Sequence, residues 1–351
     1  MILNDLADHI SNWFDGSGPN ADIVISSRIR LARNISGYNF LSRLSHDKQV
    51  ELLERLKSVI LSINIAGRTV FIDVEHASEN HRDLLVERHL ISRRHVRIQG
   101  PRGVVINLDE SFSAMINEED HLRIQCYKTG LQLNECFDQI NRIDDLIESQ
   151  IPYSFSPQYG YLTACPTNVG TGIRVSVMLH LPALKMIGHI DRFLNSARDM
   201  DLVVRGLFGE GTEATGDFFQ LSNQVTLGVT ERQIVDRFTN VIVPSIVDYE
   251  LAARRELVEK KSAMIDDKIH RALAVLRSAR LISSQEALFL LGHVRLGVTL
   301  GRVTDIPIKT INELFMLTQP AHLQVNKGQS LDPDSRDVER ARIIRSHLCQ
   351  N

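Results

Sequence analysis

Up to Gly228, short apolar runs are mixed with amphipathic stretches along the chain. Apolar positions three and four residues apart predict helices over residues 46–66 and 131–149, with shorter ones over 1–20 and 82–90. Apolar runs bounded by turn residues predict strands at 22–26, 69–74, 103–108, 161–165, 202–205 and 218–227, and two further apolar runs, at 113–117 and 122–127, flank an acidic turn. Because these strands and helices do not alternate strictly, the pattern favours an α+β fold with a mainly antiparallel sheet flanked by helices.

The last third of the chain has helical spacing throughout. Thr230 is a good N-cap for a helix that Pro244 should kink or restart, and the spacing then continues over residues 246–280. Ser283 and Glu286 form a capping-box pattern that opens the next helix. The predicted organisation is a short N-terminal helix or extension (1–20), an α+β domain (21–254) and an all-helical C-terminal domain (255–351).

Composition narrows the class of protein. The 351 residues suggest about two domains, and 43% hydrophobic with 24% charged residues excludes disordered, collagen-like and disulfide-scaffold proteins. No apolar run reaches the roughly 18 residues of a membrane span, and the N-terminus carries acids where a signal peptide carries Lys or Arg. We therefore expect a cytoplasmic protein that binds no membrane. A net charge of −3 gives no global reason to expect nucleic-acid binding.

The cysteine pattern indicates free thiols. None of the four cysteines forms a CxxC pair, so neither a zinc site nor a thioredoxin-type motif is expected. Cys126, Cys136 and Cys349 are interpreted as free, mostly buried thiols in a reducing compartment. Cys165 lies in a motif considered below.

An arginine-rich segment, SSRIRLAR, follows the first predicted strand at residues 26–33. In an extended stretch Arg28 and Arg30 share a face, and two parallel guanidinium forks suit phosphate oxygens. The alternative is a solvated basic edge.

An acidic turn stands between two apolar runs. Glu118, Glu119 and Asp120 are followed by Arg123, so a carboxylate could project into a cleft beside a phosphate-binding arginine. The alternative is a solvated turn, since charge clusters are usually exposed.

Two glycine-rich stretches, CPTNVGTGIR at 165–174 and RGLFGEGTE at 205–213, allow a ligand to approach the backbone closely. Neither contains Gly-Lys-Ser/Thr, and neither completes GxGxxG. Each carries an arginine at its edge, Arg174 and Arg205, and Glu210 lies five residues beyond the second. The segments together point to a polyphosphate site with two carboxylates for a cationic substrate.

These motifs resemble those of the guanidino kinase superfamily of creatine and arginine kinases. The shared strings are NEEDHLR (117–123), CPTNVGTGIR (165–174) and RGxxGE (205–210). SSRIRLARN (26–34), VMLHLPAL (177–184) and QLSNQVTLG (220–228) narrow the resemblance to the protein arginine kinase, McsB-type branch. The resemblance covers most of residues 20–350 and implies a guanidino-kinase-like catalytic domain over 21–254.

The resemblance implies transfer of the ATP γ-phosphate to arginine side chains of proteins, with Mg²⁺ bridging the phosphates and no metal ligand from the protein. The alternative is a metabolite kinase acting on free arginine or a related small guanidino compound. Only some 20 residues precede Asp22, where metabolite kinases carry a helical domain that covers the substrate. Gly211 also replaces a histidine common in those enzymes. Both departures favour an open site that admits an arginine on a protein.

The resemblance also implies roles for individual residues. Glu119 and Glu210 would hold the substrate guanidinium, with Glu119 as the base that accepts a proton and Glu118 as its competitor in sequence. Cys165 would lie against the guanidinium as a thiolate favoured by cationic neighbours, with a buried packing thiol as the alternative. His89 would contact the nucleotide, with a helix-surface histidine as the alternative. The implied nucleotide-binding set is Ser27, Arg28, Ile29, Arg30, His89, Arg123, Arg174, Val175, Ser176, Val177, Met178, Arg205, Gly206, Leu207, Phe208 and Gly209.

The C-terminal string RDVERA, at 336–341, matches the RDxxRA motif with which the branch binds phosphoarginine allosterically. Arg336 and Arg340 are four residues apart on one helix face and could hold a phosphate, with Asp337 receiving the guanidinium. The alternative is a surface ladder of ion pairs.

The family further implies a Clp-type protease system, a zinc-binding activator protein and a role in protein quality control and stress response. Apolar helix faces at 288–291 and 314–317 fit a homodimer, although an intramolecular core is equally good. Two other classes remain: a non-catalytic nucleotide sensor, and a nucleic-acid regulator using Arg93 and Arg94. The cluster around Arg93 and Arg94 lacks interleaved aromatic residues and is better interpreted as a solvated or substrate-docking surface.

Overall fold

The computed structural model describes residues 2–7, 11–65, 67–207 and 215–349. Its centre is an eight-stranded sheet in the order β2-β3-β4-β5-β1-β8-β10-β9, in which every neighbouring pair is antiparallel. This confirms the predicted α+β class. The strands are β1 (Val24–Arg33), β2 (Thr69–Asp73), β3 (Gly103–Asn107), β4 (Phe112–Ile116), β5 (Leu122–Thr129), β8 (Ile173–His180), β9 (Leu202–Arg205) and β10 (Phe218–Asn223), with a separate hairpin β6 (Phe155–Ser156) and β7 (Gly160–Tyr161).

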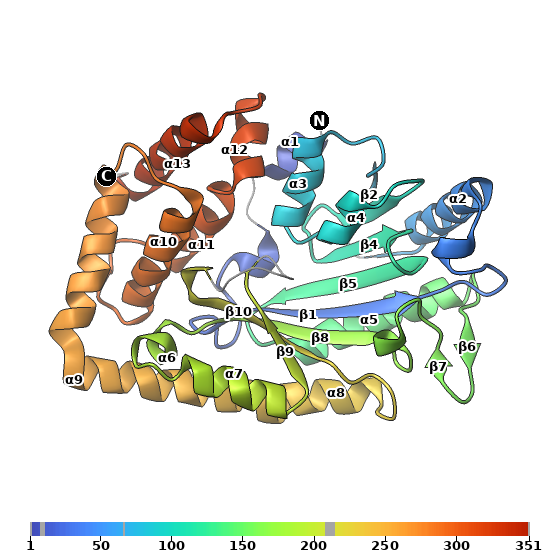
Figure 1. The fold of residues 1–351 in the computed structure, drawn as a ribbon, viewed down its shortest axis with the longest axis horizontal. Helices are drawn as coiled ribbons and strands as arrows, with labels where there is room; N and C mark the ends of the chain where they lie inside the picture. The colour runs from blue at the N-terminus through green and yellow to red at the C-terminus, as the bar shows by residue number, and fades with distance from the viewer. Residues whose placement is uncertain (1, 8–10, 66, 208–214, 350–351) are drawn as a thin grey trace.

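Helices surround the sheet, as Figure 1 shows. α5 packs on β5 and β1, and α2 packs on β2, β3 and β4, each through an apolar face. The helices of this part are α1 (Ile2–Ala7), α2 (His46–Ser62), α3 (Glu79–Glu87), α4 (Arg93–Arg97), α5 (Leu133–Glu148), α6 (Pro182–Met186), α7 (Ile190–Asp199) and α8 (Glu231–Arg237).

The region after the sheet is helical within the residues described. A 36-residue helix, α9 (Val243–Ser278), runs beside the sheet and then turns toward the remaining helices (Figure 1). The turn coincides with Lys261, whose backbone is non-helical at φ −139°. The other helices are α10 (Ser284–Thr299), α11 (Ile308–Leu317), α12 (Pro320–Lys327) and α13 (Pro333–Leu348). The predicted boundary at 254/255 falls inside α9 and remains a prediction.

One hydrophobic core joins the sheet to the C-terminal helices. Phe218 of β10 packs edge-to-face on Phe315 of α11, with ring centroids 4.7 Å apart. Phe14, in a 3₁₀ turn at Asn12–Phe14, contacts the same Phe315 ring at 6.5 Å. The N-terminal segment is therefore packed between the sheet and α11.

The predicted helix starts are confirmed. Thr230 forms a full capping box with Gln233 at the start of α8, and the Ser283 side chain accepts the Glu286 N–H at the start of α10. Pro244 lies in the first turn of α9, where its missing N–H costs no helical hydrogen bond. A π-helical turn at Phe238–Ile242 precedes it, and the backbone stays helical from α8 into α9, so what changes before Pro244 is the hydrogen-bond pattern of one continuous helix.

Several predicted elements were wrong. The helix over 1–20 is limited to α1 and the 3₁₀ turn, and α3 ends at Glu87, two residues before His89. The strand at 161–165 ends at Tyr161, because the Thr163 hydroxyl donates to the Cys165 carbonyl and the Ala164 N–H donates to Asp120. The strand β8 was not predicted, because its alternating start, Ile173 to Val177, directly follows the glycine-rich stretch and overlaps the motif that was interpreted as a ligand-binding turn.

Candidate active site

Strand register brings the predicted arginines to one face of the sheet. Arg30 of β1 lies opposite Arg174 of β8, and Ala32 lies opposite Arg123 of β5. Arg205 of β9 lies opposite Gln220 of β10, which in turn lies opposite Met178. Directly opposed residues in antiparallel strands share a face, so four strands contribute arginines to the same surface.

These side chains line a cavity of about 400 Å³, called here the arginine cavity. All five predicted phosphate-binding arginines border it, together with His89, Glu119 and Cys165. The full lining is Arg28, Arg30, Ala32, Val86, His89, Ile91, Ser92, Arg93, Arg94, Met115, Glu118, Glu119, Arg123, Gln125, Cys165, Thr167, Asn168, Gly172, Arg174, Arg205 and Gln220.

The concentration of positive charge gives the cavity its chemistry. Burial, followed by repulsion from the Arg28, Arg174 and Arg123 guanidinium groups, lowers the pKa of Arg30 well below its ordinary value. The Nε atoms of Arg28 and Arg30 are buried without a hydrogen-bond partner among the described residues. Unpaired donors and like charges in one cavity favour a polyanion, and guanidinium forks suit phosphate oxygens in particular.

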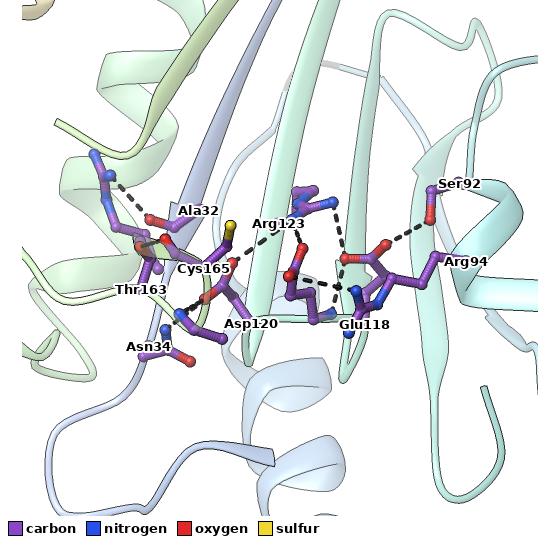
Figure 2. Close-up of polar contacts among 12 residues, drawn as sticks. Ala32, Asn34, Ser92, Arg94, Glu118, Asp120, Arg123, Thr163 and Cys165 are labelled. Atoms are coloured by element: carbon purple, nitrogen blue, oxygen red, sulfur yellow. Dashed lines mark hydrogen bonds and ion pairs between the residues drawn. The ribbon is translucent and has the colours of Figure 1, made fainter. Parts of the chain in front are cut away.

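The acidic turn between β4 and β5 surrounds Arg123, as Figure 2 shows. Its guanidinium lies 2.8 Å from Glu118, 3.2 Å from Glu119 and 3.6 Å from Asp120. The Glu118 side chain is inaccessible to solvent, whereas that of Glu119 is 21% exposed. Glu119 is therefore the member of the turn that can meet a ligand, while Glu118 fixes Arg123.

The protonation of Glu118 supports that division. Burial alone would raise the pKa of its carboxyl, but Arg123 and a 2.6 Å hydrogen bond from the Ser92 hydroxyl outweigh burial and lower it. Glu118 therefore stays ionised and keeps its ion pair with Arg123. The exposed Arg94 lies 3.4 Å from the other oxygen of Glu119.

Asp120 connects the acidic turn to the Cys165 loop, a role that the sequence analysis missed. Its Oδ1 accepts hydrogen bonds from the Asn34 side chain and from the Ala164 N–H, both at 2.7 Å (Figure 2). Cys165 is half-buried, and its Sγ lies 3.0 Å from the Thr167 hydroxyl. The sequence did not indicate this role, because Asp120 stands directly beside Glu118 and Glu119 and nothing in the motif distinguishes its carboxylate from theirs.

His89 lies outside α3, in the left-handed backbone region at φ +59°. Its carbonyl accepts hydrogen bonds from Tyr127 and Gln125, both at 2.9 Å. Burial, with repulsion from Arg28, Arg93 and Arg30, lowers the pKa of the imidazole to about 3. The ring is therefore neutral near pH 7, and the helix-surface alternative does not describe its position.

Other predicted nucleotide residues are placed differently. Ser27, Ile29 and Val175 do not line the arginine cavity; the Ser27 hydroxyl donates to the Gly130 carbonyl, and the two apolar residues belong to the core. The pleat turns their side chains to the opposite face of the sheet, and their assignment to the nucleotide site stays a prediction. Gly206 and Leu207 also lie outside the lining. Ser176, Val177 and Met178 line a neighbouring cleft. Phe208, Gly209 and Glu210 lie outside the described residues.

The C-terminal arginines bond to backbone carbonyls. Arg340 is 1% exposed and donates to Thr318 at 2.8 Å and to Ile282 at 2.9 Å, with Asp337 as its ion-pair partner. Arg336 donates to the Leu331 carbonyl at 2.8 Å. Both lie on α13 as the spacing predicts, and Arg340 points into the protein.

Comparison with known proteins identifies the family of the chain. Residues 51–253 match the model for the ATP:guanido phosphotransferase, C-terminal catalytic domain. Residues 262–351 match that for the protein-arginine kinase McsB C-terminal domain. The chain belongs to the protein-arginine kinase family. A protein-arginine kinase of Desulforamulus reducens is 47% identical over 350 residues, 99% of this chain and 98% of the relative. That of Bacillus subtilis is 41% identical over 346 residues, 98% and 94% of the two chains.

Solved structures show the same fold. A lombricine kinase aligns with a TM-score of 0.59 at 25% identity and covers 71% of this chain and 70% of its own. The duplicated taurocyamine kinase of Schistosoma mansoni aligns with a TM-score of 0.60 at 25% identity, over 68% of this chain and 34% of that one. Family membership confirms the predicted protein arginine kinase activity and does not favour the metabolite kinase alternative.

The residues that the structure describes contain neither a membrane-spanning helix nor a metal-binding cluster. None of their helices is long and apolar enough to cross a membrane. The same residues contain no cluster of three or more His, Cys, Asp or Glu side chains that could hold a metal ion.

Proposed function

We propose that the arginine cavity binds the triphosphate of ATP and that its γ-phosphoryl group is transferred there to an arginine guanidinium of a protein. One observation carries the proposal: five arginines, Glu119 and Cys165 border the same cavity. Phosphoryl transfer depends mainly on positioning and on neutralising charge, which converging guanidinium groups supply.

The acceptor requires a carboxylate. A guanidinium has a pKa above about 12, so a proton must leave as the N–P bond forms and the O–P bond to ADP breaks. We assign Glu119 as the acceptor of that proton, with Glu210 holding a second guanidinium nitrogen and Cys165 lying against the group. Glu119 fits this task because its carboxylate is accessible and faces the cavity beside Arg123.

Mg²⁺ would be held through the ATP phosphates. The cavity fits a metal–nucleotide complex because its arginines are donors for phosphate oxygens and its acidic turn is already paired with Arg123. When bound, the ion would neutralise phosphate charge during transfer.

The remaining family properties are also part of the proposal. Arg336, Asp337 and Arg340 would bind phosphoarginine as an allosteric ligand, which requires Arg340 to leave at least one of its carbonyl partners. The protein would be a cytoplasmic homodimer that marks substrates for Clp-type proteolysis together with a zinc-binding activator protein.

The deciding experiment compares acceptors. The protein is incubated with ATP and Mg²⁺ and either casein or free arginine, and phosphoarginine is identified by mass spectrometry under non-acidic conditions. We expect phosphoarginine on casein. Phosphate on free arginine alone would overturn the proposal. Loss of product in Arg123→Ala would tie the activity to the arginine cavity.

A further inference from the structure

A small cleft extends the arginine cavity beyond Arg28 and His89. It has a volume of about 10 Å³ and shares Arg28, His89 and Gln220 with the larger cavity. Its lining is Trp13, Ser26, Arg28, His89, Tyr127, Ser176, Val177, Met178 and Gln220. We call it the Trp13 cleft.

Trp13 forms one wall of this cleft. Its ring stacks on Tyr127 at a centroid distance of 5.2 Å and meets the His89 ring edge-on at 5.4 Å. The residue is 4% exposed, yet its indole Nε1 has no hydrogen-bond partner among the described residues. The Ser176 hydroxyl, 1% exposed in the same cleft, is also unpaired.

Buried polar groups without partners are costly to a folded protein, so two of them at one cleft are groups that a polar ligand entering the cleft could satisfy. In the proposed function, the arginine cavity binds the phosphates of ATP. The nucleoside at the other end of the phosphate chain would then lie at the Trp13 cleft, which adjoins that cavity. A purine base has flat aromatic faces and ring nitrogens that accept hydrogen bonds. The indole N–H, the hydroxyl of Ser176 and the neutral imidazole of His89 match that chemistry.

We propose that Trp13 is a nucleotide-binding residue that forms the wall of the base end of the ATP site. This inference rests on the proposed function, because it takes the arginine cavity as the phosphate site. The cleft is smaller than a base, so the base enters only when the surrounding side chains move apart. The environment of Trp13 therefore changes when ATP binds.

Hydrogen bonds on both sides of Trp13 fix the N-terminal segment that carries it. The Ser11 hydroxyl donates to Glu110 and accepts a 3.2 Å hydrogen bond from Arg88. On the other side, Asn312 of α11 donates to the Phe14 carbonyl at 2.9 Å. Residues that the sequence indicated only as an extension thus complete a wall of the nucleotide site.

Trp13 is the one tryptophan among the 351 residues, so its fluorescence reports on this cleft alone. The full-length protein is titrated with ATP, and with tripolyphosphate as a probe that lacks the base. We expect ATP to change the emission spectrum and tripolyphosphate to change it far less. Calorimetry measures the Kd of both ligands independently of fluorescence.

The variant Trp13→Ala should raise the Kd for ATP about 5- to 100-fold, the range for loss of one base–aromatic stack, and leave the Kd for tripolyphosphate unchanged. Trp13→Phe keeps the ring and should give a smaller rise, which guards against a failure of Trp13→Ala to fold. Asn12→Ala, at an exposed position of the same 3₁₀ turn, is the matched control and should retain the wild-type Kd.

The outcomes separate the two claims. If wild type binds ATP while its fluorescence stays constant and Trp13→Ala keeps the wild-type Kd, the inference about Trp13 is overturned and the proposed function stands. A wild-type protein that binds neither ATP nor tripolyphosphate overturns both. An equal rise in Kd for ATP and tripolyphosphate in Trp13→Phe also overturns the assignment to the base.

Discussion

At the scale of single residues, Arg30 shows how a binding site can oppose the stability of its own fold. Its guanidinium is buried beside Arg28, Arg174 and Arg123, and both burial and repulsion lower its pKa. A buried charge whose neighbours have the same sign destabilises the folded state until an anion neutralises it. The site is thus prepared for phosphate at a cost to the unliganded protein.

Arg30→Met should therefore raise the thermal midpoint without nucleotide and remove most of the stabilisation by ATP. Wild type at 100 times its Kd should gain about 2.7 kcal/mol from ligand binding. Thermal melts of both proteins with and without ATP measure the two effects. Arg30→Lys, which retains the charge, is the control, and its thermal midpoint without nucleotide should not rise. A lower midpoint for Arg30→Met without ATP would contradict the account.

Glu118 and Glu119 are adjacent in the chain but have different surroundings, and paired substitutions separate their roles. Glu119→Gln should lower kcat by about 100-fold or more, since it removes the base, while ATP still binds. Glu118→Gln should instead raise the KM for ATP, because it weakens the 2.8 Å ion pair that fixes Arg123. Steady-state kinetics and calorimetric ATP titration measure both. A normal kcat in Glu119→Gln would reject it as the base.

At the scale of elements, Glu87 joins α3 to α12. Its carboxylate accepts the backbone N–H groups of Ala321 at 2.8 Å and His322 at 3.1 Å, and it also contacts the His322 ring. Gln319, the N-cap residue of α12, makes no side-chain capping hydrogen bond to that helix, because its amide donates instead to the Phe315 carbonyl at 2.8 Å. Glu87 thus caps a helix more than two hundred residues away in the sequence.

Glu87→Ala should destabilise the protein by about 2 kcal/mol, because buried N–H groups lose charged acceptors. Urea denaturation at neutral pH measures the change. Glu79→Ala, an exposed substitution in the first turn of the same helix, is the control and should cost about 0.5 kcal/mol. If the two variants lost equal free energy of unfolding, Glu87 would stabilise the protein only through its charge near the dipole of α12, and its hydrogen bonds to that helix would contribute nothing.

The contrast between Glu119 and Glu87 shows what a sequence can and cannot predict here. Alternation along 26–33 was enough to put Arg28 and Arg30 on one face, and motif order was enough to group the arginines with Glu119 and Cys165. The partner of Glu87, the anchoring by Asp120 and the wall formed by Trp13 depend on contacts between distant segments, which leave no local periodicity. The strand predicted at 161–165 failed for the same reason, since Asp120 takes the Ala164 N–H.

At the scale of the whole molecule, buried histidines determine the response to acid. Burial lowers the pKa of His89 to about 3 and that of His95 to about 4, and it also lowers those of His121, His180 and His322. The unfolded chain binds protons at these sites near pH 6.5, whereas the folded chain does not until a lower pH. Stability therefore rises with pH between the folded and unfolded pKa values and falls on acidification.

For each such histidine, the free energy of unfolding falls by up to about 1.4 kcal/mol for every pH unit below roughly pH 6.5. Urea denaturation at pH 7.5, 6.5 and 5.5 should show a steepening loss over the two lower values. His95→Gln should reduce the slope, because it removes one of the groups that titrates. A slope unchanged by that substitution would show that His95 is protonated in the folded state.

The buried Arg295 of α10 limits how the chain can be divided into separately folding parts. It donates to the carbonyls of Ala21 at 2.6 Å and Asp22 at 2.9 Å, directly before the strand that carries Arg28 and Arg30. Removing the C-terminal helices would leave those carbonyls without this donor and expose the Phe218 ring that packs on Phe315. A catalytic part cut free of these helices would therefore need changes in its own core to stay folded, so truncation alone should not yield a stable, separately expressed domain.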